Sequence, residues 1–164
     1  MPMTTCLTLN GVAEEAAAFY VSILADARIT RITRHTVDSA QATGQEEGST
    51  LVVAFEAEGE KFMCLNAGPA DPHSPAISLV LERDTQEGID QLWEALTQGG
   101  TEMGCGWVTD RYGVAWQVAP SQWPDLVGGP DAEGARRAMQ AMMSMMKLDL
   151  AALQAAYEGA PSPA

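Results

Sequence analysis

The side chains in this sequence that could act as nucleophiles or metal ligands are few and widely spaced. There are three cysteines, Cys6, Cys64 and Cys105, and two histidines, His35 and His73. The cysteine spacing matches neither a zinc-binding pattern nor a C-x-x-C redox pair. A nucleophilic thiol needs a neighbouring base or helix N-terminus to lower its pKa, and Cys105 has no basic residue beside it. We therefore interpret all three cysteines as free thiols in a reducing cytoplasm, with Cys105 buried and structural.

A second group that could bind a ligand is the sequence Asp110-Arg111-Tyr112-Gly113. Arg111 could hold an anion through its guanidinium group. A D-R-Y-G sequence between two apolar runs is more typical of a hairpin turn with a surface ion pair. We adopt the hairpin interpretation.

Composition and charge limit the binding partners that we expect for this protein. The 164 residues are enough for one compact domain, and the formal net charge is −13. A surface this acidic repels phosphate backbones and anionic lipid, so neither nucleic acid nor membrane is expected as a partner. No apolar run approaches the ~20 residues of a spanning helix, and the N-terminus lacks the features of a signal peptide. We expect a cytoplasmic protein.

The first half of the chain predicts one helix among several strands. Residues 4–9, 28–37, 50–55 and 61–65 are rich in β-branched or alternating residues, and a tight turn at 58–60 makes the last two a hairpin. Ala16, Phe19, Tyr20 and Ile23 lie on one face of a helix over residues 12–24. Residues 38–49 are polar and contain glycine, which predicts a long exposed loop.

The second half repeats this order after a proline-rich linker at residues 66–75. A strand is expected at 77–82, a capping box at 84–87, and a helix with Ile89, Leu92, Trp93 and Leu96 on one face. Gly99-Gly100 ends that helix, and strands follow at 103–109 and 114–119. We predict an α+β fold of duplicated β-α-β-β-β modules, residues 1–66 and 76–119, within one compact domain.

The remaining residues, 120–158, predict a helical extension. Pro130-Asp131 begins a helix with a stripe of Met139, Met142, Met143 and Met146, and Asp149 can cap a last helix that carries Leu150, Leu153 and Tyr157. Methionine fills irregular gaps in cores and interfaces, and we interpret the stripe in this way rather than as a metal site. An apolar face of this kind needs a cover, from the same chain or from a second subunit.

Three stretches together resemble the PhnB-like branch of the vicinal-oxygen-chelate superfamily, which includes glyoxalases, bleomycin-resistance proteins and extradiol dioxygenases. Residues 9–20 resemble its x-G-x-A-E-E-A…F-Y opening, and residues 105–118 resemble its C-G-W-x-x-D-R-F-G-x-x-W-Q-V motif. Residues 142–157 resemble its A-M-x-x-M-x-K-x-D-I-A-x-L-x-x-A-Y tail. The resemblance implies paired modules whose mixed sheet curves around a cup, commonly in a homodimer, with any activity located in the cup.

Metal-using members of that superfamily place histidine or glutamate on the cup face of four strands. By pattern these positions fall on Thr4 or Thr5, on Cys64 or Asn66, near Ala76 with Ser78 next to it, and on Gln117. Divalent cations prefer carboxylate, imidazole or thiolate ligands, which this set supplies at most once. We predict no bound metal or other cofactor; a metal would require His73, Glu56 or a second subunit to contribute.

The ligand-pocket candidates are therefore mostly neutral side chains: Cys6, Thr8, Cys64, Asn66, Ser78, Trp107 and Gln117. Strand alternation predicts that Trp107 lines the cup and that Trp116 packs under a helix. Many relatives are named demethylubiquinone methyltransferases, but the turn after the first strand is not the glycine-rich turn of a methyl-donor fold. The sequence favours a homodimer that binds a small, partly apolar molecule. The alternatives are a metal-dependent lyase, isomerase or dioxygenase, and a purely structural dimer.

Overall fold

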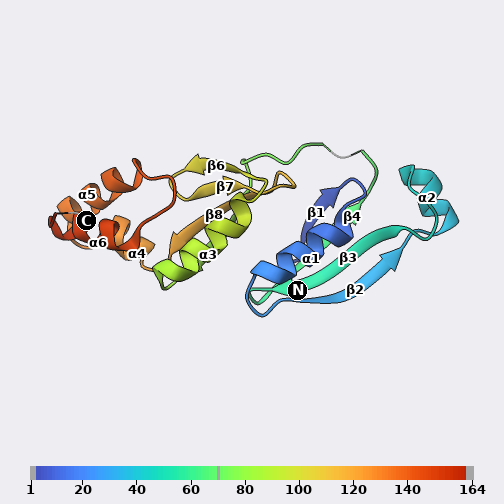
Figure 1. The fold of residues 1–164 in the computed structure, drawn as a ribbon, viewed down its shortest axis with the longest axis horizontal. Coiled ribbons are helices and arrows are strands. Elements are labelled where there is room, and N and C mark those ends of the chain that lie inside the picture. The colour runs from blue at the N-terminus through green and yellow to red at the C-terminus, as the bar shows by residue number, and fades with distance from the viewer. Residues whose placement is uncertain (1–2, 70, 162–164) are drawn as a thin grey trace. The chain divides into compact units, whose positions relative to one another are not determined.

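The chain folds as two compact units, Met1–Pro72 and His73–Ala164 (Figure 1). The computed structural model describes residues 3–69 and 71–161. Residues 1–2 of the predicted first module and residue 70 of the predicted linker lie outside the described residues. Each unit contains one four-stranded mixed sheet with a helix on one of its faces.

The first unit has the expected helix and strands, together with one helix that was not predicted. Its elements are β1 (Thr5–Leu9), α1 (Ala13–Ile23), β2 (Arg28–Arg34), α2 (Val37–Thr43), β3 (Thr50–Ala57) and β4 (Glu60–Asn66). The strand order is β1-β4-β3-β2, and only the β1–β4 pair is parallel.

Helix α1 covers one face of the first sheet. Because side chains alternate along a strand, Val53 and Phe55 of β3 share this face with Phe62 of β4, and all three are buried. Phe55 stacks on Tyr20 of α1 with ring centroids 6.0 Å apart, and on Phe62 at 5.1 Å. We call the opposite side of each sheet its open face.

The long loop predicted at residues 38–49 is wrong, because its first part forms α2. Thr36 and Ser39 make a reciprocal capping box at the N-terminus of this helix, and Gly44 ends it at φ 71°. A helix with one buried residue, Ala40, lacks the apolar stripe on which the prediction depended. The preceding strand, expected to reach residue 37, ends at Arg34.

The second unit repeats the topology of the first. Its module consists of β5 (Leu79–Arg83), α3 (Gln86–Thr97), β6 (Thr101–Gly104), β7 (Trp107–Thr109) and β8 (Ala115–Pro120). The strand order β5-β8-β7-β6 matches β1-β4-β3-β2 position by position, with the β5–β8 pair parallel. The predicted α+β fold with a duplicated module is therefore confirmed.

The single strand predicted at residues 103–109 is wrong in detail, because it folds back as the hairpin β6–β7. Gly104, Cys105 and Gly106 turn the chain with φ values of 81°, 53° and 78°. Two glycines accept the left-handed conformation at little cost, which permits so tight a turn. This hairpin supplies the fourth strand of the second sheet.

The C-terminal extension forms α4 (Trp123–Gly128), α5 (Ala132–Met142) and α6 (Leu150–Glu158). Asp131 and Asp149 cap α5 and α6 through their side chains, as predicted. The extension forms one apolar cluster with the end of β8, made up of Ala119, Leu126, Ala138, Met142, Leu148 and Leu153.

The methionine stripe predicted on one long helix is wrong, because α5 ends at Met142. Met142 is buried, but Met143 and Met146 follow the helix and are 66% and 54% exposed. The described part of the chain contains no helix long and apolar enough to cross a membrane. A cytoplasmic location stays a prediction.

Candidate functional site

The open face of the second sheet carries a row of side chains directed away from α3. Val80 of β5 pairs with Gln117 of β8, and Gln117 pairs with Trp107 of β7. Their neighbours Trp116 and Val118 point to the opposite face and are buried beside α3. Strand alternation thus separates the packed side of β8 from the side that a ligand can reach.

A small pocket of about 100 Å³ opens on this face. Its floor is the sheet, and its wall comes from the C-terminal extension. The lining residues are Val80, Cys105, Trp107, Gln117, Val118, Ala119, Trp123, Met142 and Leu148. The described lining residues include no charged side chain, so the pocket is suited to a neutral, largely apolar group with one or two polar atoms.

Gln117 is the main polar group of the pocket, and Ser78 orients it. The Gln117 Nε2 atom donates a hydrogen bond of 2.8 Å to Ser78 Oγ. With Nε2 engaged in this way, the Oε1 atom is the part of the amide that can accept a hydrogen bond from a ligand. Of the predicted candidates, the structure brings Ser78, Trp107 and Gln117 together.

The position of Gln117 depends on the turn between β7 and β8. Asp110 is only 4% exposed, and its carboxylate accepts hydrogen bonds from Tyr112 N at 2.8 Å and Val114 N at 3.1 Å. It also accepts one of 2.8 Å from Trp116 Nε1. The predicted turn is present, but Asp110 is a buried residue rather than a surface one. By binding both ends of the turn, Asp110 holds Trp107 opposite Gln117.

The candidates of the first unit separate onto two faces. Cys6 and Thr8 lie on the open face, whereas Cys64 and Asn66 are buried on the face covered by α1. The expectation that Cys64 or Asn66 faces the cup was therefore wrong by one residue. Their open-face neighbours Met63 and Leu65 are half-buried and apolar.

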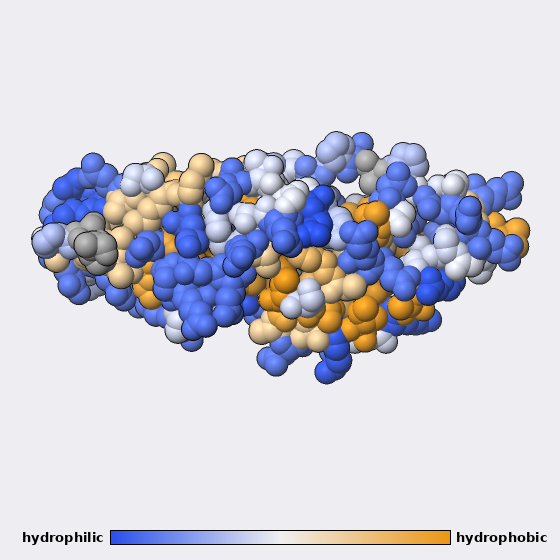
Figure 2. Space-filling model, viewed as in Figure 1, coloured by the Kyte–Doolittle hydropathy of each residue, from blue (hydrophilic) through white to orange (hydrophobic). Residues whose placement is uncertain are grey.

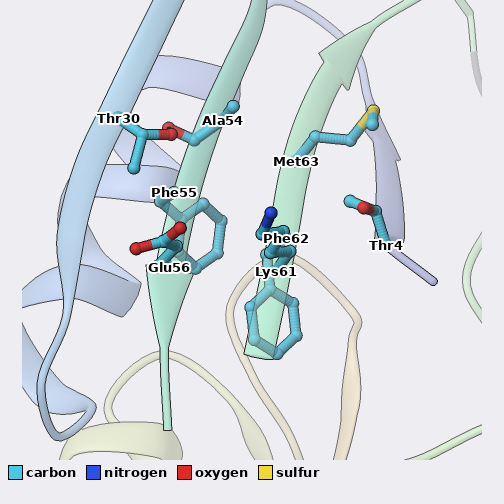
Figure 3. A pocket seen from close by; sticks show the side chains of 8 residues that line it. All are labelled: Thr4, Thr30, Ala54, Phe55, Glu56, Lys61, Phe62 and Met63. Carbon is cyan, nitrogen blue, oxygen red and sulfur yellow. The ribbon is translucent and has the colours of Figure 1, made fainter. Parts of the chain in front are cut away.

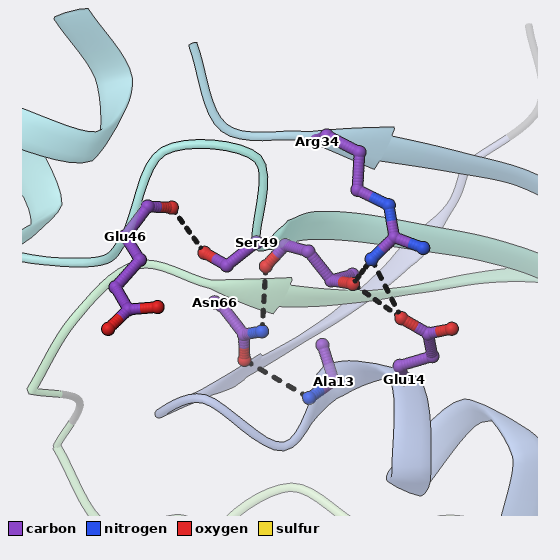
Figure 4. A network of polar contacts seen from close by, with 7 residues as sticks. Ala13, Glu14, Arg34, Glu46, Ser49 and Asn66 are labelled. Atoms are coloured by element: carbon purple, nitrogen blue, oxygen red, sulfur yellow. Dashed lines mark hydrogen bonds and ion pairs between the residues drawn. The ribbon is translucent and has the colours of Figure 1, made fainter. Parts of the chain in front are cut away.

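Asn66 has a structural task beneath α1 (Figure 4). Its Oδ1 accepts a hydrogen bond of 3.1 Å from Ala13 N at the start of that helix, and its Nδ2 donates one of 2.8 Å to Thr50 O. Nearby, Glu14 accepts hydrogen bonds from Thr50 Oγ1 and Arg34 Nη1. The Thr50 hydroxyl, followed by the Arg34 charge, lowers the pKa of Glu14.

A second pocket, of about 210 Å³, lies on the first unit and was not foreseen from the sequence (Figure 3). It is lined by Thr4, Thr30, Ala54, Phe55, Glu56, Lys61, Phe62 and Met63. Glu56 is paired with Arg28 at 2.5 Å on the rim. Thr4 is one of the two residues matched to the first ligand position, but none of the seven pocket candidates lines this hollow. The sequence signals for this pocket are the hairpin pairing of β3 with β4 and the strand alternation that puts Ala54 and Glu56 on the open face.

The donor atoms at the four superfamily ligand positions do not suit a metal ion. Thr4 or Thr5 offers a hydroxyl, the second position a thioether or an alkyl group on the open face, the third a methyl group at Ala76 or a hydroxyl at Ser78, and Gln117 an amide. Hard and borderline divalent cations are held by carboxylates and imidazoles. Within residues 3–69 and 71–161, no three His, Cys, Asp or Glu side chains are grouped so that they could hold a metal ion.

Comparison with known proteins identifies the family. The family model described as 3-demethylubiquinone-9 3-methyltransferase matches residues 1–119. The chain belongs to this family. The PhnB protein from Bacillus cereus, which carries the same methyltransferase name, is 31% identical and has a TM-score of 0.65. The match covers 74% of this chain and all of that one. No curated protein matches this chain.

Two further solved structures are more distant. Protein PA1353 from Pseudomonas aeruginosa is 20% identical, covers 73% of this chain and 97% of its own, and has a TM-score of 0.55, which shows a shared fold. A glyoxalase/bleomycin resistance protein from Albidiferax ferrireducens is 16% identical over 71% of this chain and 95% of its own, with a TM-score of 0.44. The predicted PhnB-like resemblance is confirmed. Residues 120–164 lie beyond the family match.

Proposed function

We propose that this PhnB-like protein binds a small, neutral, partly apolar molecule on the open face of the second sheet. The observation that carries this proposal is the pocket of about 100 Å³ in which Gln117 is the oriented polar group beside Trp107. A ligand N–H or O–H that donates to Gln117 Oε1, together with a flat apolar body against Trp107, would use both features.

The volume limits the size of the bound group. A water molecule occupies about 30 Å³ of liquid, and a cavity of about 150 Å³ holds benzene. This pocket therefore accepts a group smaller than a benzene ring, either as a whole ligand or as the end of a longer one. At a ceiling of about −1.5 kcal/mol per heavy atom, a four-atom group binds no tighter than tens of micromolar.

The turn after β1 does not resemble a site for a methyl donor. A methyl donor usually binds on a glycine-rich turn after the first strand of a doubly wound parallel sheet. In this chain β1 is followed by Asn10-Gly11 within a mixed sheet. The family name therefore carries no step that we can assign to residues of this chain.

We also propose that the protein is a homodimer. The supporting surface is apolar: Ile29 and Ile32 on the edge strand β2 are each 39% exposed, and Figure 2 shows hydrophobic residues in patches over the first unit. Covering such residues is a common function of subunit contacts. Light scattering gives the mass of the full chain in solution, and we expect the mass of two chains. A monomeric full chain would contradict the dimer.

The binding proposal is tested with pyrrole and furan, two five-membered rings of similar size. Only pyrrole carries an N–H that can donate to Gln117. In ¹⁵N-labelled protein, pyrrole is expected to shift the indole N–H signal of Trp107 and to leave that of Trp93, which lies on α3, unchanged. One net hydrogen bond of about 0.5–1.5 kcal/mol makes furan roughly two- to tenfold weaker.

The matched variant is Gln117→Met, which keeps the length of the side chain and removes the amide. It is expected to make pyrrole and furan bind equally. No response of Trp107 to tens of millimolar pyrrole would refute the binding proposal. Stoichiometric binding of Zn²⁺, Ni²⁺ or Mn²⁺ that raises the melting temperature, with no effect of either ring, would instead support the metal-dependent enzyme.

A further inference from the structure

The wall of the pocket comes from a part of the chain that the family model does not cover. The match ends at residue 119, whereas Trp123, Met142 and Leu148 lie beyond it and line the pocket. We infer that the C-terminal extension limits the size of the ligand, with Leu148 as the residue that sets the limit. This inference rests on the proposed ligand pocket and adds the element that determines its specificity.

Leu148 is fixed from the side of α3. The Gln86 side chain donates from Nε2 to Leu148 O at 3.1 Å and accepts from Leu150 N at 2.8 Å, so it binds the chain on both sides of residue 149. Lys147 Nζ lies 2.6 Å from Asp90 Oδ1, one helical turn beyond Gln86. Three contacts over four residues hold this segment against the module.

The β6–β7 turn fixes the same segment from the other side. Cys105 N and Gly106 N donate to Met145 O and Met146 O at 2.7 Å and 2.8 Å. A Cβ atom at Gly106 would lie 2.7 Å from Val118 O and 3.0 Å from Leu148 Cγ. Glycine at position 106 thus lets Leu148 pack directly on the backbone of the turn.

The result is a rigid wall rather than a mobile tail. Leu148 is 2% exposed and belongs to the apolar cluster that joins β8 to the extension. A side chain packed into this cluster cannot move aside for a larger ligand without losing its packing. We expect the pocket to admit a five-membered ring or a short chain, and a fused bicyclic ring to need the space that the Leu148 side chain occupies.

Removing the Leu148 side chain should remove this limit. A single Leu→Ala substitution in another protein core opened a cavity of about 150 Å³ that accepts benzene. Added to the existing pocket of about 100 Å³, a space of that order admits indole. Indole contains the pyrrole ring and its N–H donor, and it differs by the fused six-membered ring.

The experiment measures the binding of pyrrole and of free indole to the full chain. The readout is the side-chain N–H signal of Trp107. The wild-type protein is expected to bind pyrrole and not indole. Leu148→Ala is expected to bind indole at least tenfold more tightly than the wild-type protein does. Leu148→Val, a smaller truncation, gives an intermediate gain and serves if Leu148→Ala does not fold.

Leu153→Ala is the matched control, because Leu153 is fully buried in the same cluster but does not line the pocket. It should lower stability without an indole response at Trp107. Two results would overturn the size limit and leave the proposed function standing, provided that the wild-type protein binds pyrrole. In the first, neither Leu148 variant binds indole. In the second, the wild-type protein binds indole as tightly as Leu148→Ala does. Indole binding to Leu148→Ala without pyrrole binding to the wild-type protein supports the wall and overturns the proposed function. Binding of neither probe to any variant overturns both.

Discussion

Replacing Asp110 with alanine tests whether the turn between β7 and β8 holds the second unit together. The Asp110 carboxylate accepts hydrogen bonds from Trp116 Nε1, Tyr112 N and Val114 N at 2.8, 2.8 and 3.1 Å. Trp116 and Val114 are 1% and 5% exposed, so their N–H groups have no easy access to water once the carboxylate is removed.

The size of the effect follows from these two buried donors. A buried donor left without a partner costs about 1–3 kcal/mol, so Asp110→Ala should lower the free energy of unfolding by about 2–6 kcal/mol. Domains are typically stable by only about 5–15 kcal/mol, so this is a large loss. Asp110→Asn keeps one carbonyl oxygen for the turn but directs an amide N–H₂ group at the indole N–H of Trp116. It should lose about 1–3 kcal/mol.

Urea unfolding followed by tryptophan fluorescence is the appropriate assay. All four tryptophans, at positions 93, 107, 116 and 123, lie in His73–Ala164, so the signal reports on the second unit alone. With a slope of about 2 kcal/mol per molar urea, a loss of 3 kcal/mol moves the midpoint down by about 1.5 M.

The control is Glu94→Gln, which removes an equal charge from an exposed site on α3 of the same unit and should change stability by less than about 0.5 kcal/mol. The expected order of stability is wild type, then Asp110→Asn, then Asp110→Ala. Equal midpoints for Asp110→Ala and Glu94→Gln would show that the carboxylate does not hold the turn.

Two further predictions concern the segment that carries the pocket wall. Gly106→Ala should destabilise more than Gly113→Ala in the same urea assay: both glycines have positive φ, 78° and 83°, but only at Gly106 would a Cβ atom meet other atoms. The left-handed strain alone costs about 1–2 kcal/mol, so an equal effect of the two variants would contradict the packing described for Gly106. The hydrogen bond from Lys147, followed by that from Gln86, lowers the pKa of Asp90 from its ordinary 3.8. Because the folded pKa lies below the unfolded one, this stabilisation is present above about pH 4 and is lost as the pH falls through the folded pKa. In Asp90→Asn, the free energy of unfolding should therefore fall less steeply at acid pH, by less than about 1 kcal/mol, as expected for an exposed pair. An unchanged acid dependence would contradict the contact between Asp90 and Lys147.

Local patterns were sufficient to predict most of the elements. The i, i+3, i+4, i+7 stripes located α1 and α3, and the caps Asp131 and Asp149 located the starts of α5 and α6. Prediction failed where no apolar periodicity exists, as in α2, or where a turn interrupts a β-rich run, as at Gly104-Cys105-Gly106. Periodicity measures burial on one face, so a short polar helix leaves little trace in it.

The candidate site was partly predictable for the same reason. Alternation along β7 and β8 placed Trp107 and Gln117 on one face and Trp116 on the other, which needs only the strand period of two residues. Along β4 the same rule failed at Cys64, because an error of one residue in register exchanges the two faces of a strand.

The sequence by itself determined the family, the duplicated module and the neutral character of the residues at the superfamily ligand positions. Each of these depends on residue types or on spacings of a few residues. Only the tertiary structure decided that Leu148, Met142 and Trp123 form the wall beside Gln117, and that Asp110 is buried under Trp116. Leu148 lies about thirty residues from Gln117 in the chain, and no local pattern encodes a contact at that separation. Such contacts form only when helices and sheet pack together, because packing depends on the shape of the whole core.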